Sequence, residues 1–534
     1  MIYVLLSNFI LMKRRTFLDF LMKGAAASIL PLHLVGCDDP NVLSKYKGLL
    51  PMRTDQLNLI EGVSMQILLK RGDEFGKQLF FGSNNDYTAM LPMGPNRYML
   101  WVNHEYLNPL FVHKKFVSAE KTKKEVEIEM KEVGGSLIEI ERLDSGELKV
   151  VQDSIYNRKI DGLTPIPFAN EINILDQDSA LGTLANCAGG KTPWGTFLTC
   201  EENYDGFYGE RDYKTGNRIP SEHYGWENHF DCPPEHYGWV VEINPKSGEA
   251  QKLTALGRCA HECATVFQLE DGRCVVYTGD DANDEHLYKF ISKRPNDLSE
   301  GTLYVANLEL NRWIPIDIEK QDILKANFSN QLEVLIRLRE AAKLVGATPL
   351  DRPEDIEIDP ITGHVLIALT NNKPKGNFMG SILKLIADDN NHESLSFSHE
   401  TFLAGGEETG FACPDNLVFD QKGNLWFTTD ISGSAIGSEP YKAFGNNALF
   451  VVPRFGERAG EILRIASAPM DAELTGVSFV PDSNELLVCV QHPGEESKDL
   501  DNLTSNWPEG KKGVVPKSAV VILSGEFFDD LWSI

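Results

Sequence analysis

The chain has 534 residues, and its 78 acidic side chains outnumber the 51 basic ones, which gives a formal net charge of −27 at pH 7. A surface this acidic repels the phosphates of nucleic acids, so we expect no nucleic-acid partner. The length is large for one core, yet no Gly/Ser-rich or Pro-rich linker divides the sequence, so we expect one domain built from repeated units.

Residues 1–37 have the layout of an export signal. Arg14 and Arg15 form a twin arginine ahead of a modest apolar stretch, which closes on LVGC at residues 34–37. That ending resembles the lipobox of bacterial lipoproteins, in which the cysteine is acylated. A transmembrane anchor is the alternative, but the run is short and is interrupted by polar residues and a proline. We therefore predict export by the twin-arginine machinery, a lipid anchor at Cys37, and a periplasmic or membrane-anchored location.

The rest of the chain divides into a lead-in and a main domain. We expect residues 38–74 to be a tether and lead-in, and residues 75–534 to be a single main domain that carries the site. Residues 114–133 mix Lys and Glu at helical spacing and predict a solvated helix. Residues 204–237 are rich in Tyr, His, Trp and acidic groups and predict a loop that overhangs one face. Residues 319–346 carry apolar residues at helical spacing and predict an amphipathic helix on the surface.

A strand–turn–strand pattern recurs along the chain. Each copy has an alternating apolar strand, a turn built on Asp, Asn, Pro, Ser or Gly, and a second apolar strand, which is the signature of a β-hairpin. The copies lie at residues 138–151, 240–253, 265–281, 356–370, 417–430 and 477–490. Repeated hairpins without alternating helices predict an all-β fold, a β-propeller with long decorated loops and a few surface helices. A β-sandwich or a β-helix is the competing interpretation.

Eight cysteines follow Cys37. An even number in an oxidising compartment permits disulfides, and Cys259 and Cys263 could form one. However, the spacings are irregular, and a chain of this size does not need such crosslinks to fold.

Potential metal ligands gather where the predicted strands end. Many carboxylates that converge on one pore repel one another, so several bound cations are expected to neutralise them. Oxygen ligands suit Ca²⁺ or Mg²⁺, and a thiolate or imidazole among them admits iron or zinc. The clusters are Asn103–His104–Glu105, Cys200–Glu201–Glu202–Asn203, His261–Glu262, Asp280–Asp281, Arg352 with Glu354 and Asp355, Asp415–Asn416, Glu473, and Gln491–His492 with Glu495.

Several of these segments carry a family resemblance. In chain order, NNDYTAMLP, VNHEY, NCAGGKTPWGTFLTCEENYDGF, GRCAHE, DRPEDIEIDP and VQHPGE resemble the PhoX family of alkaline phosphatases, over roughly residues 75–530. The resemblance implies a six-bladed propeller that is exported by the twin-arginine route and hydrolyses phosphate esters. It also implies a cofactor of two ferric ions, one held by a cysteine thiolate, together with several calcium ions.

The resemblance also assigns roles to single residues. Cys200 of LTCEEN would be the iron-bound thiolate, and Arg352 would bind the phosphate through its planar fork of donors. An asparagine contacts phosphate in the family, and Asn186 and Asn103 are the two candidates. Glu354 is expected both to bind metal and to take part in catalysis. The complete set of expected metal ligands is Cys200, Glu201, Glu202, Glu262, Glu354, Asp281, Asp415, Glu473 and Glu105.

Two other functions remain open from the sequence. Another calcium-dependent propeller hydrolase, a lactonase or a phosphotriesterase, would use the same oxygen ligands without the thiolate at Cys200. A lipid-anchored binding propeller with purely structural calcium would not need Arg352 at the cluster. No Ser-His-Asp spacing or GxSxG motif is present, so a serine hydrolase is disfavoured. We expect a monomer that acts on small phosphate esters.

Overall fold

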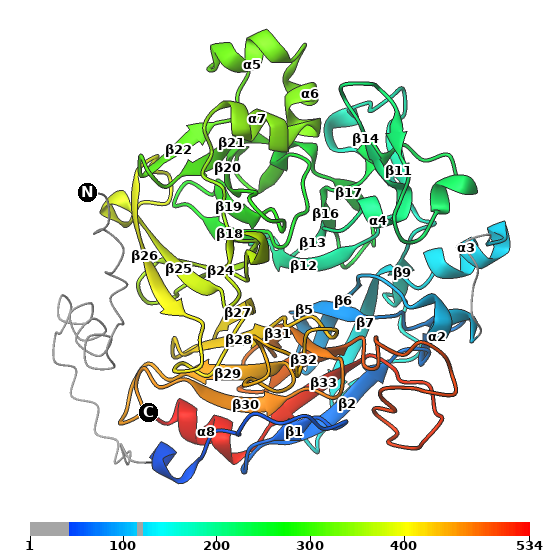
Figure 1. Cartoon of the computed structure of the whole chain (residues 1–534), viewed down its shortest axis with the longest axis vertical. Coiled ribbons are helices and arrows are strands. Elements are labelled where there is room, and N and C mark those ends of the chain that lie inside the picture. The colour runs from blue at the N-terminus through cyan, green and yellow to red at the C-terminus, as the bar shows by residue number, and fades with distance from the viewer. Residues whose placement is uncertain (1–41, 115–120) are drawn as a thin grey trace, which may run out of the picture.

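Six antiparallel sheets of four or five strands surround a central axis in the computed structural model, which describes residues 42–114 and 121–534 (Figure 1). Blade 1 contains β5 (Asn85–Gly94), β6 (Arg97–His104), β7 (Gly134–Arg142) and β8 (Leu148–Val150), with β9 (Arg158–Ile160) paired to β7. Blade 2 contains β12 (Asn186–Lys191), β13 (Phe197–Glu201), β16 (Val240–Ile243) and β17 (Ala250–Lys252). Blade 3 contains β18 (Thr265–Gln268), β19 (Cys274–Gly279), β20 (Leu287–Arg294), β21 (Asp297–Asn307) and β22 (Arg312–Pro315).

The remaining three blades complete the ring. Blade 4 contains β23 (Pro353–Ile358), β24 (Val365–Leu369), β25 (Ser381–Ala387) and β26 (Phe397–Ala404). Blade 5 contains β27 (Pro414–Phe419), β28 (Leu425–Thr429), β29 (Ala448–Val452), β30 (Leu463–Ser467) and β1 (Asn58–Leu59). Blade 6 contains β31 (Glu473–Phe479), β32 (Leu486–Gln491), β33 (Ala519–Ser524) and β2 (Ser64–Lys70). The prediction of a six-bladed β-propeller is confirmed.

All six predicted hairpins form, but they occupy two different places in the blades. In blades 3 to 6 the predicted hairpin is the first pair of strands, nearest the axis. In blades 1 and 2 it is the outermost pair, β7–β8 and β16–β17. Strands such as β24 and β32 are buried at every residue because each blade packs between two others and has no solvent face. Their sequences, VLIAL and LLVCVQ, are therefore continuously apolar rather than alternating.

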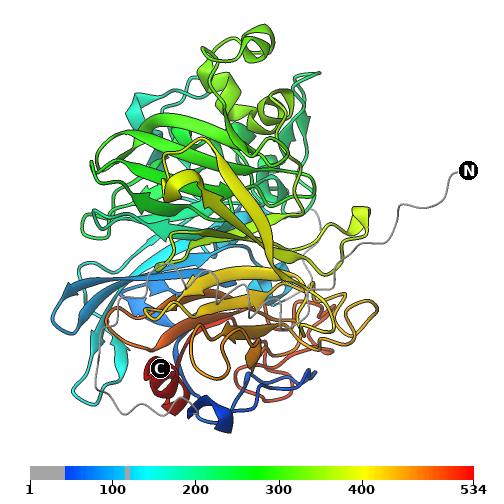
Figure 2. The same cartoon turned by 90° about the vertical axis from the view of Figure 1, so that its left-hand side faces the viewer.

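The N-terminal lead-in contributes strands to the ring. β1 pairs with β30, and β2 pairs with β33 from Ser64 opposite Ser524 to Lys70 opposite Ala519. The preceding turn η1 (Val42–Lys45) lies beside the C-terminal helix α8 (Glu526–Trp532), as Figures 1 and 2 both show. The propeller strands thus begin before residue 75.

The helices are shorter than the sequence predicts. The expected helix over 319–346 is three helices, α5 (Asp322–Asn327), α6 (Gln331–Ile336) and α7 (Leu338–Leu344). It breaks before α6 because the Asn330 side chain accepts a hydrogen bond from the Glu333 amide at 3.0 Å and so caps a new helix. Within 114–133, α3 covers Lys123–Met130, and residues 115–120 lie outside the described part.

The 204–237 insertion is folded and packs against α3. It contains α4 (Asp205–Tyr208), the hairpin β14 (Glu210–Arg211) and β15 (Arg218–Ile219), and the turns η3 (Trp226–Asn228) and η4 (Pro234–His236). Buried Glu129 of α3 accepts a hydrogen bond from the Trp226 indole at 2.9 Å and pairs with Lys121 at 2.8 Å. The remaining short elements are α2 (Pro109–His113), β3 (Glu74–Gly76), β4 (Leu79–Phe80), β10 (Pro165–Pro167), β11 (Ser179–Leu181), η2 (Ala169–Glu171), η5 (Thr254–Leu256), η6 (Lys373–Lys375) and η7 (Asp388–Asn390).

Two further expectations concern cysteines and the membrane. The eight cysteines from Cys187 to Cys489 are all free thiols, so Cys259 and Cys263 are not joined. In the described ranges, no helix has both the length and the apolarity that a membrane crossing requires. The predicted export signal, including Arg14, Arg15 and Cys37, lies outside the described residues.

Candidate metal centre

A β-bulge near the start of the first strand aims side chains into the central channel. In five blades, two residues of the first strand lie opposite one residue of the second. These bulges fall between Asn85 and Thr88, Asn186 and Gly189, Pro353 and Ile356, Pro414 and Leu417, and Thr475 and Ser478. Bulges redirect side chains and recur next to active sites. The first extra residue is Asp86, Cys187, Glu354, Asp415 or Gly476 in turn. At Gly476 a β-carbon would lie 2.0 Å from the Asp86 carbonyl oxygen, so only glycine fits there.

A second set of polar side chains comes from the ends of the second strands. Glu105 follows β6, Glu202 follows β13, Asp281 lies just beyond β19, and Asp430 follows β28. Glu262 completes the set from the segment before β18, where its amide donates to the Gly279 carbonyl oxygen at 3.2 Å. The fold therefore brings together residues that are far apart in the sequence.

These side chains line a central cavity of about 160 Å³. Arg352 is the one guanidinium or ammonium group in the described wall, beside Cys187, Asn203, Tyr106, Gln491 and His492. The cavity has nine carboxylates: Asp86, Glu105, Glu202, Glu262, Asp281, Glu354, Asp415, Asp430 and Glu473. So many buried acids with so few counter-charges indicate a site built for cations.

The ligand atoms form three overlapping triads, each with its atoms within 4.8 Å of one another: Asp86–Glu105–Cys187, Cys187–Glu202–Glu262, and Glu262–Asp281–Glu354. Cys187 and Glu262 are each shared by two triads. The Cys187 sulfur lies 3.2 Å from Glu262 Oε2 and 3.5 Å from Asp86 Oδ2. The triads thus form one continuous row of ligands with the thiol inside it.

Burial and mutual repulsion oppose ionisation of this row. Burial, followed by the charge of Asp281, raises the pKa of Glu202 well above its usual value. Burial and the charge of Glu354 do the same for Glu262. Burial raises the pKa of Glu105 to about 7. Burial and nearby carboxylates likewise raise the pKa of the Cys187 thiol. Cations bound between these groups would favour their charged forms.

Arg352 is fixed by the carboxylates on its side of the cavity. Its Nε and Nη2 donate to the two oxygens of Asp281 at 2.8 and 2.7 Å, and Nη2 lies 2.8 Å from Glu354. Its Nη1 reaches Asp430 at 3.3 Å. Although burial acts in the opposite direction, the charge of Arg352 lowers the pKa of Asp430. The guanidinium is therefore held in one place, and its side chain keeps 23% of its surface accessible.

Eight of the residues predicted from the sequence meet in this cavity: Glu105, Glu202, Glu262, Asp281, Arg352, Glu354, Asp415 and Glu473. Four others lie elsewhere, namely Cys200, Glu201, Asn186 and Asn103. The thiol of the cavity is Cys187, whereas Cys200 is part of a hydrophobic cluster between blades. Cys200 lies within β13, the second strand of its blade, and its side chain is fully buried in that cluster and does not line the cavity.

The other misplaced residues make buried structural contacts. Glu201 pairs with Lys252 at 2.6 Å, and both side chains are fully buried. Asn186 donates to Thr183 and Thr199, both at 2.8 Å. Asn103 is also fully buried and does not line the cavity.

Asp86, Cys187 and Asp430 also line the cavity, and they were not predicted from the sequence. Asp86 and Cys187 stand at the bulge position of their blades, equivalent to Glu354 and Asp415. Aligning the first strands as NDYT, NCAG, PEDI and PDNL would have placed all four at one structural position.

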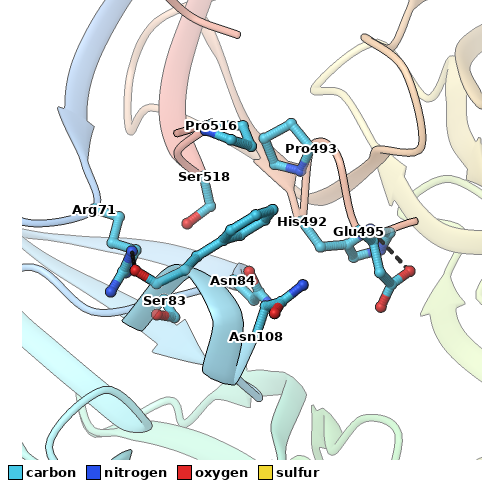
Figure 3. A pocket seen from close by; sticks show the side chains of 10 residues that line it. Arg71, Ser83, Asn84, Asn108, His492, Pro493, Glu495, Pro516 and Ser518 are labelled. Atoms are coloured by element: carbon cyan, nitrogen blue, oxygen red, sulfur yellow. Dashed lines mark hydrogen bonds and ion pairs between the residues drawn. The ribbon is translucent and has the colours of Figure 1, made fainter. Parts of the chain in front are cut away.

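Two further cavities border the centre. Beyond His492 lies a cavity of about 20 Å³, room for about one water molecule, in which Asn84 Nδ2 and Ser518 Oγ have no hydrogen-bond partner among the described residues (Figure 3). Farther along the inner strands, a cavity of about 190 Å³ is lined by Lys191, Asp355 and Glu357, among others. Burial there raises the pKa of Glu357 to about 8, helped by the charge of Asp355.

Comparison with known proteins agrees with this geometry. The family model of the alkaline phosphatase PhoX matches residues 44–494. A solved structure, Pseudomonas fluorescens PhoX in complex with vanadate, a transition-state analogue, is 30% identical, with a TM-score of 0.80 over 90% of this chain and 98% of that chain. No curated protein matches the chain.

More distant structures resemble the chain only weakly. A Dyadobacter fermentans protein of unknown function and a gluconolactonase from Xanthomonas campestris are each 10% identical, with TM-scores of 0.39 and 0.33. The two matches cover 88% and 84% of this chain, and 100% and 97% of the matched chains, in the same order. At such low similarity, neither structure informs the function of this chain. On the family match and the Pseudomonas structure together, the chain belongs to the PhoX family of alkaline phosphatases.

Proposed function

We propose that this phosphatase cleaves phosphomonoesters at a centre of iron and calcium ions, and that it does so outside the cytoplasm. Family membership establishes phosphate-ester hydrolysis. The observation that carries the metal assignment is the row of three overlapping triads that share Cys187 and Glu262.

The residues of the cavity fit such ions. Asp86 Oδ1 is buried and has no hydrogen-bond partner in the described chain. A buried oxygen whose partner is a bound cation would show this pattern when only protein atoms are considered. The numerous carboxylate oxygens suit Ca²⁺, and the single thiol suits iron. Cys187 thus takes the role that the sequence comparison gave to Cys200. We propose that the row of three triads holds two Fe³⁺ ions, and that the cavity carboxylates outside the row hold Ca²⁺. Such ions would supply charge neutralisation and Lewis acidity at the phosphoryl group.

Arg352 and Asn203 are proposed to hold the phosphate. Arg352 is pinned by Asp281 on one side and lines the cavity with its fork of donors, which matches two phosphate oxygens. Asn203 lies at the exposed rim and takes the place expected of Asn186 or Asn103. The Pseudomonas relative binds vanadate, a transition-state analogue, which supports a site that recognises a transferring phosphoryl group.

The protein's own side chains do not supply a clear nucleophile. No serine or threonine belongs to the described lining of the cavity. Burial and the surrounding carboxylates raise the pKa of the Cys187 thiol, so without a cation it is a poor nucleophile. An oxygen species other than a side chain is therefore the proposed attacking group, and Arg352 is proposed to stabilise the equatorial oxygens of the transition state.

The export signal supports the proposed location. Arg14 and Arg15, followed by the LVGC ending, favour the twin-arginine route and a lipid at Cys37, which would tether the protein to a membrane. Cys37 precedes η1 by only a few residues, so the propeller would sit close to the membrane surface.

The test combines elemental analysis of the exported chain with a phosphomonoester assay at alkaline pH, before and after calcium chelation. Iron and calcium together, with hydrolysis lost on chelation and restored by calcium, are expected. Hydrolysis by a chain that carries no iron would refute the metal assignment. Absence of phosphate release from every monoester tried, with both metals bound, would refute the substrate class.

A further inference from the structure

The bulge that aims Cys187 lies in an irregular stretch of β12. Between Asn186 and Gly189, β12 has one residue more than β13 opposite, so the regular ladder is interrupted at Cys187 and Ala188. One side of the bulge is tied to blade 3, because the Ala188 amide donates to the Glu262 carbonyl oxygen at 3.0 Å. The direction of the thiol therefore depends on what holds the other side.

That other side is held by a side chain from blade 1. Asn103, near the end of β6, donates through Nδ2 to the Cys187 carbonyl oxygen at 2.6 Å and to the Ala188 carbonyl oxygen at 3.0 Å. Both of these contacts fall on the two residues of the bulge. Asn103 is fully buried, so neither contact competes with solvent.

The amide of Asn103 can point only one way. Its Oδ1 accepts from the Trp101 indole at 2.6 Å and from the Thr199 hydroxyl at 2.7 Å. An indole N–H can only donate, and a backbone carbonyl can only accept. Turning the amide over would set its NH₂ group against the indole and its oxygen against two carbonyl oxygens. The orientation is thus fixed by chemistry on both sides.

We propose that Asn103 is a positioning residue for the thiolate ligand: it clamps the β12 bulge so that Cys187 points into the row of triads. This inference rests on the proposed metal centre and deepens it. Asn103 was expected from the family resemblance to contact phosphate. Its side chain instead makes four hydrogen bonds away from the cavity, so we assign it the positioning role in place of the phosphate contact.

The experiment compares three full-length chains. Asn103→Asp keeps the shape and the two accepted bonds but turns an oxygen toward the two bulge carbonyls. Thr183→Val is the matched control, because it removes one buried hydrogen bond, donated by Asn186, and none that is made to the bulge residues Cys187 and Ala188. Iron content is measured after dialysis against graded EDTA. The rate at which iodoacetamide alkylates Cys187 is followed peptide by peptide in the metal-free chains, and thermal unfolding is recorded for each.

Asn103→Asp is expected to lose iron at about 10- to 100-fold less chelator than the wild type, and to alkylate at Cys187 at a changed rate. Thr183→Val is expected to unfold at a lower temperature with wild-type iron retention and alkylation. Equal iron retention in Asn103→Asp and the wild type would overturn the proposal, as would an equal loss in Thr183→Val.

Two provisions keep the test decisive. If Asn103→Asp does not fold, Thr199→Val serves instead, and a shift in the same direction but smaller is expected. It removes the bond to Asn103 Oδ1 and also a bond that Asn186 donates. Thr183→Val, which removes the other bond of Asn186, controls for that second loss. If the wild type carries no iron, the proposed metal centre fails by itself, and the alkylation rates still decide the clamp: unchanged Cys187 reactivity in Asn103→Asp would refute it.

Discussion

Replacing Cys187 by serine should remove most of the phosphatase activity, whereas replacing Cys200 by serine should leave it intact. Cys187 belongs to two of the three ligand triads and lines the central cavity. Cys200 is fully buried in a hydrophobic cluster one strand farther from the axis. The same chemical change thus probes two thiols that differ in position.

The two variants should fail in different measurements. Loss of one preorganised charged group from a transition state costs about 3 kcal/mol, so Cys187→Ser should lower kcat/KM about 100-fold or more. Cys200→Ser instead places a hydroxyl in apolar surroundings, which costs about 1–3 kcal/mol of folding free energy when the hydroxyl finds no partner. Its thermal unfolding should therefore shift down by a few degrees, roughly 2–4 °C per kcal/mol.

The assay is hydrolysis of p-nitrophenyl phosphate at alkaline pH, normalised to metal content, with thermal unfolding of both variants measured alongside. An inactive Cys200→Ser that unfolds like the wild type, paired with an active Cys187→Ser, would refute the placement of the thiolate ligand.

Three further outcomes are expected. Arg352→Lys should lower kcat/KM about 100-fold with metal content unchanged, because lysine keeps the charge but not the planar set of N–H donors that binds two phosphate oxygens. A near-normal rate would exclude Arg352 from phosphate binding. Burial raises the pKa of Glu357 to about 8 from 4.5, so the folded chain loses stability as the pH rises from 4.5 to 8. Glu357→Gln cannot ionise, so above pH 8 it should be more stable than the wild type by at least about 1 kcal/mol, and below pH 4.5 the two should be equally stable. Urea unfolding below pH 4.5 and above pH 8 checks this, and equal stability of the two chains above pH 8 would contradict it. Gly476→Ala should lower both the unfolding temperature and the iron content, because the added carbon collides with the Asp86 backbone. Gly72 also has a positive φ, but no atom lies within 4 Å of the added carbon, so Gly72→Ala should lower the unfolding temperature alone. Equal iron losses in the two variants would argue against the steric cause.

The propeller could be predicted because each hairpin is specified locally by its turn and by two apolar strands. The break before α6 was missed because Asn330 caps a helix only when the chain turns there, and apolar spacing does not register a cap. β2 was missed for a different reason: its partner β33 lies at the other end of the chain, so no neighbouring turn announces the pairing.

In the site, sequence patterns found the residues that follow regular strands and missed some of those on bulges. Glu105 and Glu202 stand directly after strands, where polar residues interrupt an apolar run. Cys187 stands inside a strand whose phase is shifted by one residue, and a period of two cannot show such a shift. The choice of Cys200 followed from its acidic neighbours, and only tertiary structure shows that its side chain faces the space between blades.

The pairing of β2 with β33 also sets the order in which the ring can close. Blade 6 lacks its outer strand until the N-terminal segment returns to it, because Ser64 and its partner Ser524 are separated by 460 residues. Closing so long a loop costs conformational entropy that only the completed contact offsets. We therefore expect blade 6 to be completed after the blades whose strands are neighbours in the sequence.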